Sequence, residues 1–241
     1  MAREGLEPAP ALLVIAHAWD AAASGFVARH ESAGAALLTP RDLSRSGWRF
    51  RVADPTGTIA VAGGRRFRLG EAGGALTRVP AVTELDLPHI AAEDRAYVAA
   101  ELTAFLLAVL SAAPILVANR PTPQCLCGPG WSDARWRRTA GGLGLRAASL
   151  RQRVAAAEAP AADEESAAEA VVIAGRCVAS PNPALADAAV RLAAFAGASM
   201  LTVEFDSTAP DAAVLRARPF VDLADKLADQ AAARLFRAAA G

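Results

Sequence analysis

The chain has 241 residues, enough for one domain or two small ones, and 54% of them are hydrophobic while only 5% are aromatic. Basic and acidic side chains are balanced at 25 each, so the basic excess that nucleic-acid binding requires is absent and we expect no nucleic-acid partner. A formal net charge of zero also makes self-association easier.

The compartment is predicted from three features. The first seven residues are charged and lack the apolar core of a signal peptide. The longest apolar stretch, residues 99–118, is interrupted by Glu101 and Pro114, so we expect no membrane span. Three cysteines are too few, and odd in number, for a disulfide framework. These features predict a cytoplasmic protein.

The first segments alternate between strand and helix. The apolar run 11–16 predicts a strand buried on both faces, and 35–38 predicts a second strand. Between them Asp20 can cap a helix that reaches about Ser32. A strand–helix–strand opening favours a parallel sheet.

The next segments predict short strands. Residues 49–52 and 58–62 flank an Asp-Pro-Thr-Gly turn, and 66–69 follows a Gly-Gly turn. We expect these three to be antiparallel strands at the edge of the sheet. Residues 75–80 are a further strand candidate.

The remaining elements are longer. Residues 91–112 have a helical pattern with Glu93 and Asp94 in the first turn, where the helix dipole favours anions. Residues 155–168 are acidic, rich in alanine and of low complexity, which is typical of a linker or a frayed helix. We also expect strands at 115–118, 200–205 and 213–216, a strand or a hairpin turning at Gly175 over 170–179, and helices at 133–141, 183–196 and 221–239.

This pattern predicts an α/β protein. Residues 1–150 would form a domain with an open, mostly parallel sheet and flanking helices. Residues 151–169 would be an acidic, alanine-rich linker, and 170–241 a small α+β part.

In the first half, the order of elements resembles that of the ATP-grasp ligases, above all the glutathione-synthetase-like and peptide-maturase branches. The strand–helix–strand of Leu12–Leu38 resembles the opening of their N-terminal domain. Leu76–Pro80 is similar to a family strand with an Arg-Pro-like end, Asp94–Glu101 to an acidic helix start, and Val117–Pro121 to a strand that ends in Asn-x-Pro.

The last portion of the family also has a counterpart. Leu201–Phe205 resembles the strand that carries a metal-binding carboxylate, here Glu204. The next strand of the family carries a Glu and an Asn for magnesium, but this chain has Arg216 and Arg218 at those positions. Arginine is protonated and has no lone pair to offer, so it cannot coordinate a cation.

The resemblance implies a subdomain between Leu145 and Ala170 that clamps the nucleotide with two lysines. This chain has the short acidic linker there and no lysine. We therefore expect a reduced ATP-grasp-fold protein that binds no cofactor and no metal and that acts as a small-molecule-binding, scaffolding or accessory subunit. Its expected partners are a small acidic ligand and a second copy of the chain or another protein.

The alternative is a biosynthetic enzyme that keeps the family's acyl or amino-acid substrate site. It would ligate with help from a partner or perform a different reaction. The resemblance permits a cofactor pathway, such as pterin- or furan-linked one-carbon metabolism. No residue is assigned as catalytic.

Candidate binding residues follow the predicted N-terminal strands. His17 and Asp20 come after the first strand, and Arg78 and Asn119 end later ones. Because open α/β sheets bind ligands at the carboxyl ends of their strands, we expect these four side chains at one rim. An arginine there suits a carboxylate or phosphate. The alternatives are a helix cap and a partly buried loop histidine for Asp20 and His17, and a turn residue and an ion pair for Asn119 and Arg78.

Two further groups stay open at this point. Arg216 and Arg218 share a strand face, and Glu204 could pair with one of them in a degenerate metal site, or the arginines could bind an anion. Cys125 and Cys127 form a lone C-x-C, which is weak support for a metal site.

Overall fold

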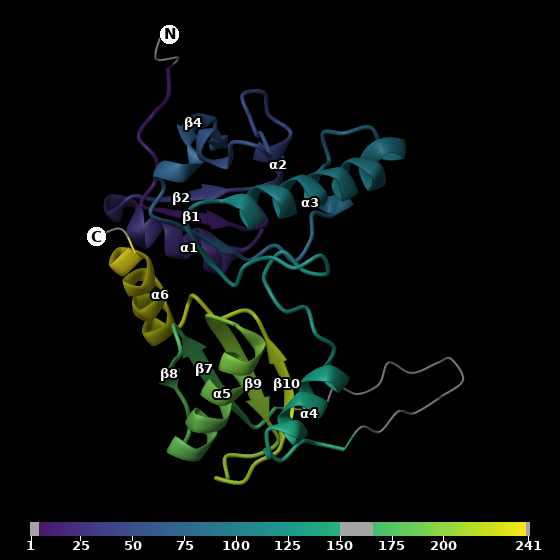
Figure 1. The fold of residues 1–241 in the computed structure, drawn as a ribbon, viewed down its shortest axis with the longest axis vertical. Coiled ribbons are helices and arrows are strands. Elements are labelled where there is room, and N and C mark those ends of the chain that lie inside the picture. Colours follow the sequence, from purple (N-terminus) through teal and green to yellow (C-terminus); the bar gives the residue numbers. More distant parts are fainter. Residues whose placement is uncertain (1–4, 150–165, 240–241) are drawn as a thin grey trace. The chain divides into compact units, whose positions relative to one another are not determined.

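The computed structural model describes residues 5–149 and 166–239, and these form two compact units (Figure 1). The first unit comprises residues 1–130 together with 222–241, and the second comprises 131–221. The predicted domains were 1–150 and 170–241. In the structure the first unit ends at residue 130 and also includes the C-terminal helix. Most of the predicted linker, residues 150–165, lies outside the described residues.

The first unit is built on a parallel sheet. Its strands are β1 (Leu12–Ile15), β2 (Ala35–Leu38), β5 (Gly74–Thr77) and β6 (Leu116–Ala118), in the order β2-β1-β5-β6. All three pairings are parallel, which confirms the predicted α/β class. All four residues of β1 are buried, as expected of a central strand with both faces covered. The strand order reverses between β1 and β5, where open sheets of this kind form a ligand crevice.

The described residues of this unit form four helices: α1 (Ala21–His30), α2 (Pro40–Leu43), α3 (Arg95–Ala112) and α6 (Lys226–Ala239). Asp20 caps α1 by accepting a hydrogen bond from the backbone N–H of Ala23 at 2.9 Å. Short 3-10 turns lie at Glu31–Ala33, Pro55–Gly57, Leu69–Glu71, Glu84–Asp86 and Ala92–Asp94.

Helix α3 packs Leu106, Val109 and Leu110 into the core beside Leu13 and Ile15 of β1. With the turn before it, residues Ala92–Ala112, it is the one helix among the described residues long and apolar enough to cross a membrane. A single such helix is weak support for a span, since the core helices of globular proteins can have the same length and composition.

Helix α6 is held by a carboxylate near its start. Asp229 accepts hydrogen bonds from Arg29 Nε at 3.0 Å and Nη2 at 2.8 Å, and it lies 3.0 Å from His30 Nε2. Both partners are in the last turn of α1. This cluster connects α6 to the end of α1.

The predicted edge strands are only partly present. β3 (Ile59–Ala62) and β4 (Arg65–Arg68) pair antiparallel in a two-stranded sheet of their own. The predicted strand at 49–52 was wrong, because only Arg49 forms a bridge, to Ile59. Phe50 instead packs edge-on against Phe105 of α3, with ring centroids 6.2 Å apart.

The part of the second unit that the structure describes consists of an antiparallel sheet and two helices. Its strands β7 (Ala168–Ile173), β8 (Arg176–Ala179), β9 (Met200–Phe205) and β10 (Val214–Arg218) have the order β10-β9-β7-β8. The helices are α4 (Asp133–Gly142) and α5 (Pro183–Ala196). β7 and β8 form the predicted hairpin, in which Ala174 and Gly175 have φ of 53° and 73°.

Candidate functional site

The carboxyl ends of β1 and β5 bring Asp20 and Arg78 together. Arg78 Nε donates to Asp20 Oδ2 at 2.7 Å, and the backbone N–H of Arg78 donates to the carbonyl of Ile15 at 2.7 Å. Both side chains are mostly buried, with 15% of Arg78 and 17% of Asp20 exposed. The pair lies where the strand order reverses, which is the place the sequence predicts for a ligand.

The electrostatics of this pair limit what it can bind. Burial raises the pKa of Asp20, but the hydrogen bond and charge of Arg78 and the N–H of Ala23 outweigh it, so the pKa stays below its usual value. Asp20 is therefore ionised at neutral pH, and its negative charge compensates the positive charge of Arg78. An acidic ligand at Arg78 has to compete with this carboxylate.

His17 joins the same rim through two contacts. Its Nδ1 lies 2.8 Å from Oδ1 of the buried Asp86, and its ring stacks on Trp19 at 4.5 Å between centroids. Asp86 also accepts hydrogen bonds from the backbone N–H and the hydroxyl of Thr83, each at 2.8 Å. The sequence did not single out Asp86 or Trp19. A short acidic turn after a Thr was the available signal, because Thr83 and Asp86 form a capping box.

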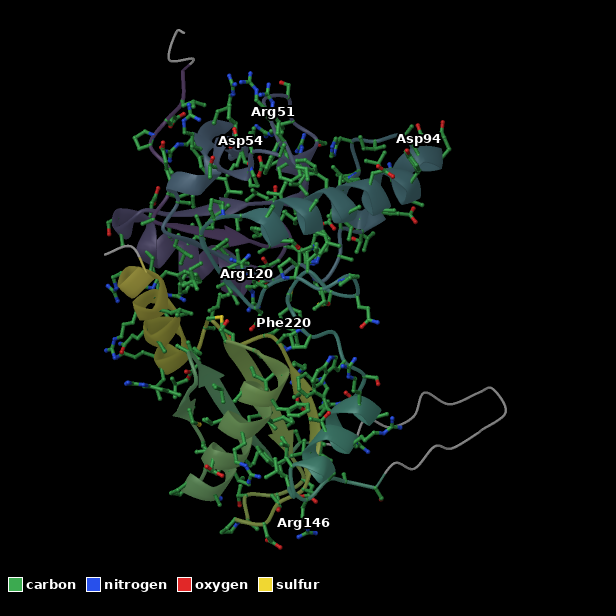
Figure 2. The ribbon with its side chains drawn as sticks, viewed as in Figure 1. Arg51, Asp54, Asp94, Arg120, Arg146 and Phe220 are labelled. Carbon is green, nitrogen blue, oxygen red and sulfur yellow. The ribbon has the colours of Figure 1, made fainter. Side chains whose placement is uncertain are left out.

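Asn119 and the cysteine pair lie beyond β6. Asn119 is buried and has φ of 53°, a region that asparagine tolerates. Gly128 packs against it so closely that a Cβ there would meet Asn119 Cβ at 2.8 Å. The next residue, Arg120, caps the end of α3 by donating to the carbonyls of Leu110 and Ser111 at 3.3 Å (Figure 2).

Cys125 and Cys127 are both buried and hydrogen-bonded to each other. The hydrogen bond from Cys127 lowers the pKa of Cys125 to about 6, whereas burial raises the pKa of Cys127. Among the described residues, no group of three or more His, Cys, Asp or Glu side chains could hold a metal ion.

A second cluster lies in the other unit. Glu204 on β9 faces Arg216 on β10 directly across the ladder. Arg216 Nε donates to Glu204 Oε2 at 2.6 Å, and Arg218 Nη2 forms an ion pair with Glu204 Oε1. Glu204 is only 1% exposed, so both of its oxygens are held by guanidinium groups in a buried position.

Comparison with known proteins identifies the architecture. No protein-family model and no curated protein matches the chain. Solved structures do match. The ATP-grasp ligase PsnB, in complex with a minimal precursor, Mg and ADP, gives a TM-score of 0.69 at 11% identity, over 98% of this chain and 99% of PsnB. The chain has the ATP-grasp fold.

Two further ATP-grasp-fold structures agree. The macrocyclase MdnC of Microcystis aeruginosa MRC, bound to the precursor peptide MdnA, gives a TM-score of 0.64 at 11% identity, over 93% of this chain and 98% of MdnC. An ATP-grasp ligase associated with RiPPs from Chryseobacterium gregarium, in complex with ADP and a leader and core peptide, gives 0.62 at 8% identity over 95% of each chain. These identities establish a shared fold, so the activity has to be argued from this chain's own residues.

The residues present do not fit the magnesium that ATP-grasp ligases use. Magnesium requires several oxygen ligands in octahedral arrangement. The resemblance assigns the ligand positions to Glu204, Arg216 and Arg218, where the only carboxylate is paired with two cations. Glu169 on β7 lies next to this group, but its Oε1 is 3.6 Å from Arg218 and its side chain is half exposed.

Proposed function

We propose that this chain is an ATP-grasp-fold pseudoenzyme, a protein that does not ligate by itself and that acts as a binding or accessory subunit. The observation that carries the proposal is the buried Glu204, whose two oxygens are ion-paired with Arg216 and Arg218. A magnesium ion at Glu204 would have to displace both guanidinium groups. Breaking a buried ion pair costs about 3–5 kcal/mol, and the ion would then lie beside two fixed positive charges.

The lysine content supports the same proposal. The resemblance implies two lysines between Leu145 and Ala170, and the sequence has none there. The single lysine of the chain, Lys226, begins α6 in the other unit. A phosphate group in the expected position would therefore lack the ammonium donors that the fold family provides.

An accessory role requires partners, and the surface of the first unit favours them. Trp19, Leu85 and Tyr97 are 55%, 78% and 69% exposed. They belong to connected segments, since Trp19 stacks on His17, His17 bonds Asp86, and the turn of Leu85 and Asp86 packs at α3. Exposed apolar groups of this size are typical of interfaces. We propose that they take part in a homodimer or in a complex with another protein in the cytoplasm.

The ligand proposal follows from the rim. His17, Asp20, Arg78 and Asn119 are proposed to line a site for a small acidic ligand, which exchanges with Asp20 at Arg78. PsnB and MdnC are bound to precursor peptides, so a carboxylate-bearing peptide is among the ligands to be tested.

The decisive experiment measures thermal stability with MgATP. A ligand at 100 times its dissociation constant adds about 2.7 kcal/mol to the free energy of unfolding. We expect no rise in Tm with millimolar MgATP relative to Mg²⁺ alone. The double variant Arg216→Glu/Arg218→Asn, which restores the acidic and amide side chains, is the matched comparison for cation binding, measured with Mn²⁺ as a paramagnetic probe.

A clear rise in Tm of the unaltered chain with MgATP, absent with Mg²⁺ alone, would sink the pseudoenzyme proposal. Release of ADP or AMP in the presence of candidate acids would favour the alternative, a biosynthetic enzyme of a cofactor pathway. Tm unchanged by MgATP, together with Mn²⁺ binding gained only by the double variant, would support the proposal.

A further inference from the structure

The arginines of the chain are unevenly distributed. Residues 41–68 contain seven arginines and two aspartates, a net charge of +5, and because the whole chain is balanced the remaining residues carry −5. This segment includes the β3–β4 hairpin and the loop that precedes it. Charge of one sign on a small surface attracts ligands of the other sign.

A cavity of about 330 Å³ lies within this segment, lined by Arg45, Ser46, Val61, Gly64 and Arg66. Three of these residues, Arg45, Ser46 and Arg66, carry polar side chains. It is separate from the rim of His17, Asp20, Arg78 and Asn119, with which it shares no lining residue.

The Arg45 side chain is oriented by Asp42 and lies against Gly64, which has no Cβ. Its Nε lies 3.4 Å from Oδ1 of Asp42, which is buried and whose Oδ2 accepts hydrogen bonds from Thr39. Its Nη1 lies over Gly64, where a Cβ would come within 3.1 Å of it. Gly64 has φ of 81°, so glycine is favoured there on two grounds. Asp42 thus fixes one edge of the guanidinium and leaves Nη1 at the cavity.

Arg66 carries an unsatisfied donor. Its Nε is buried, and no described residue offers it a hydrogen-bond acceptor. Gly47, with φ of 113°, lies against the same side chain, and a Cβ there would be 3.1 Å from both Cδ and Nε. A buried donor without an acceptor is costly, more so when it is charged, and such a group requires an explanation. Arg66 lines the cavity while this nitrogen lacks an acceptor among the described residues.

We propose that this cavity binds the phosphoryl group of a small phosphate monoester. Arg45, Ser46 and Arg66 line it and carry hydrogen-bond donors for an anion, and a phosphoryl group offers three acceptor oxygens, whereas a carboxylate offers two. The volume exceeds that of a phosphoryl group alone, so the organic part of the ligand also enters. The site is independent of the accessory function proposed above.

The test is a titration of the full chain with inorganic phosphate and with methyl phosphate at constant ionic strength. Binding is measured by calorimetry and by the ³¹P line width, and Tm is recorded with and without each phosphate. We expect one site and a rise in Tm. The variant Arg45→Gln/Arg66→Gln should weaken binding about 100-fold or more, because each substitution removes a charge-assisted hydrogen bond and the loss of one such bond weakens binding about tenfold. Arg51→Gln is the matched control. Arg51 lies in the same basic segment beside Asp54 (Figure 2). It is not among the residues that line the cavity, so its loss should change binding less than about twofold.

Three results would overturn the proposal. They are no binding of either phosphate at millimolar concentration, an equal loss of affinity in Arg51→Gln, and acetate binding as tightly as phosphate. If the double variant does not fold, Arg66→Lys decides the question, since it keeps the charge and loses Nε. A phosphoserine peptide that binds more tightly than methyl phosphate would place the source of the phosphoryl group on a protein, and the reverse order would place it on a metabolite.

Discussion

The buried ion pairs of Glu204 with Arg216 and Arg218 predict that the substitution Glu204→Gln destabilises the fold. The substitution keeps the shape of the side chain and removes its charge, so Arg216 and Arg218 lose their shared partner. Breaking a buried pair typically costs about 3–5 kcal/mol, but Arg216 is 24% exposed and Arg218 is 52% exposed, and solvent screens both. We therefore expect a loss of about 3 kcal/mol, at the low end of that range. For a chain of this length it corresponds to a Tm lower by about 6–12 °C.

The assay is urea and thermal unfolding followed by circular dichroism, with Glu169→Gln as the matched control. Glu169 is the neighbouring carboxylate on β7, half exposed and 3.6 Å from Arg218, so its loss should cost less than about 1 kcal/mol. Glu204→Gln/Arg216→Gln should recover part of the stability, because replacing both members of a buried pair costs less than removing one. If Glu204→Gln unfolds with the wild-type midpoint, the argument that this carboxylate is tied to the arginines is wrong.

Three further predictions follow from described contacts. The pKa of Asp20 is lower in the folded chain than its unfolded value near 3.8, so the stability that Asp20 contributes is present above that value and is lost as the pH falls through the folded pKa. The urea midpoint of Asp20→Asn should therefore depend less on pH than that of wild type in this acidic window. Identical pH profiles of the two proteins would contradict this. Cys125 is 8% exposed and Cys127 is fully buried, and the hydrogen bond with Cys127 lowers the pKa of Cys125 to about 6. Iodoacetamide at about pH 7 should therefore label Cys125 slowly but faster than Cys127, as measured by peptide mass spectrometry, and equal labelling rates of the two thiols would refute this. Light scattering should give twice the chain mass of 24.7 kDa, and Tyr97→Glu should shift it towards the monomer, whereas a wild-type monomer at micromolar concentration would remove the dimer from the proposal.

Much of the fold was predictable because it follows local patterns. The run Leu12–Ile15 is apolar on both faces and became a central strand, and Asp20 caps the following helix as its position after the strand indicates. The strand predicted at 49–52 failed since alternation alone does not supply a partner strand. Phe50 finds its apolar contact on α3, a helix more than forty residues away in sequence.

The site was less predictable than the fold, and the reason is long-range pairing. Residue order places His17 and Arg78 at strand ends. Nothing in the local sequence indicates that His17 contacts Asp86 or that Arg78 forms an ion pair with Asp20. The pairing of Glu204 with an arginine was foreseeable, since adjacent antiparallel strands bring alternate residues to one face. The buried, unsatisfied Nε of Arg66 could not be predicted from the sequence, because its burial depends on how Gly47 packs against the side chain.

The connection of α6 to α1 has a consequence for synthesis. Because Asp229 belongs to the final helix and Arg29 and His30 to the first, the first unit is complete only after the second unit has been translated. Until residues 226–239 leave the ribosome, Phe236 is missing from its place against Gly74, and the apolar surface around Ala11 and Ala35 has no cover from Ala233. The nascent chain therefore presents this surface to chaperones throughout the production of the second unit, which can fold first although it is encoded later.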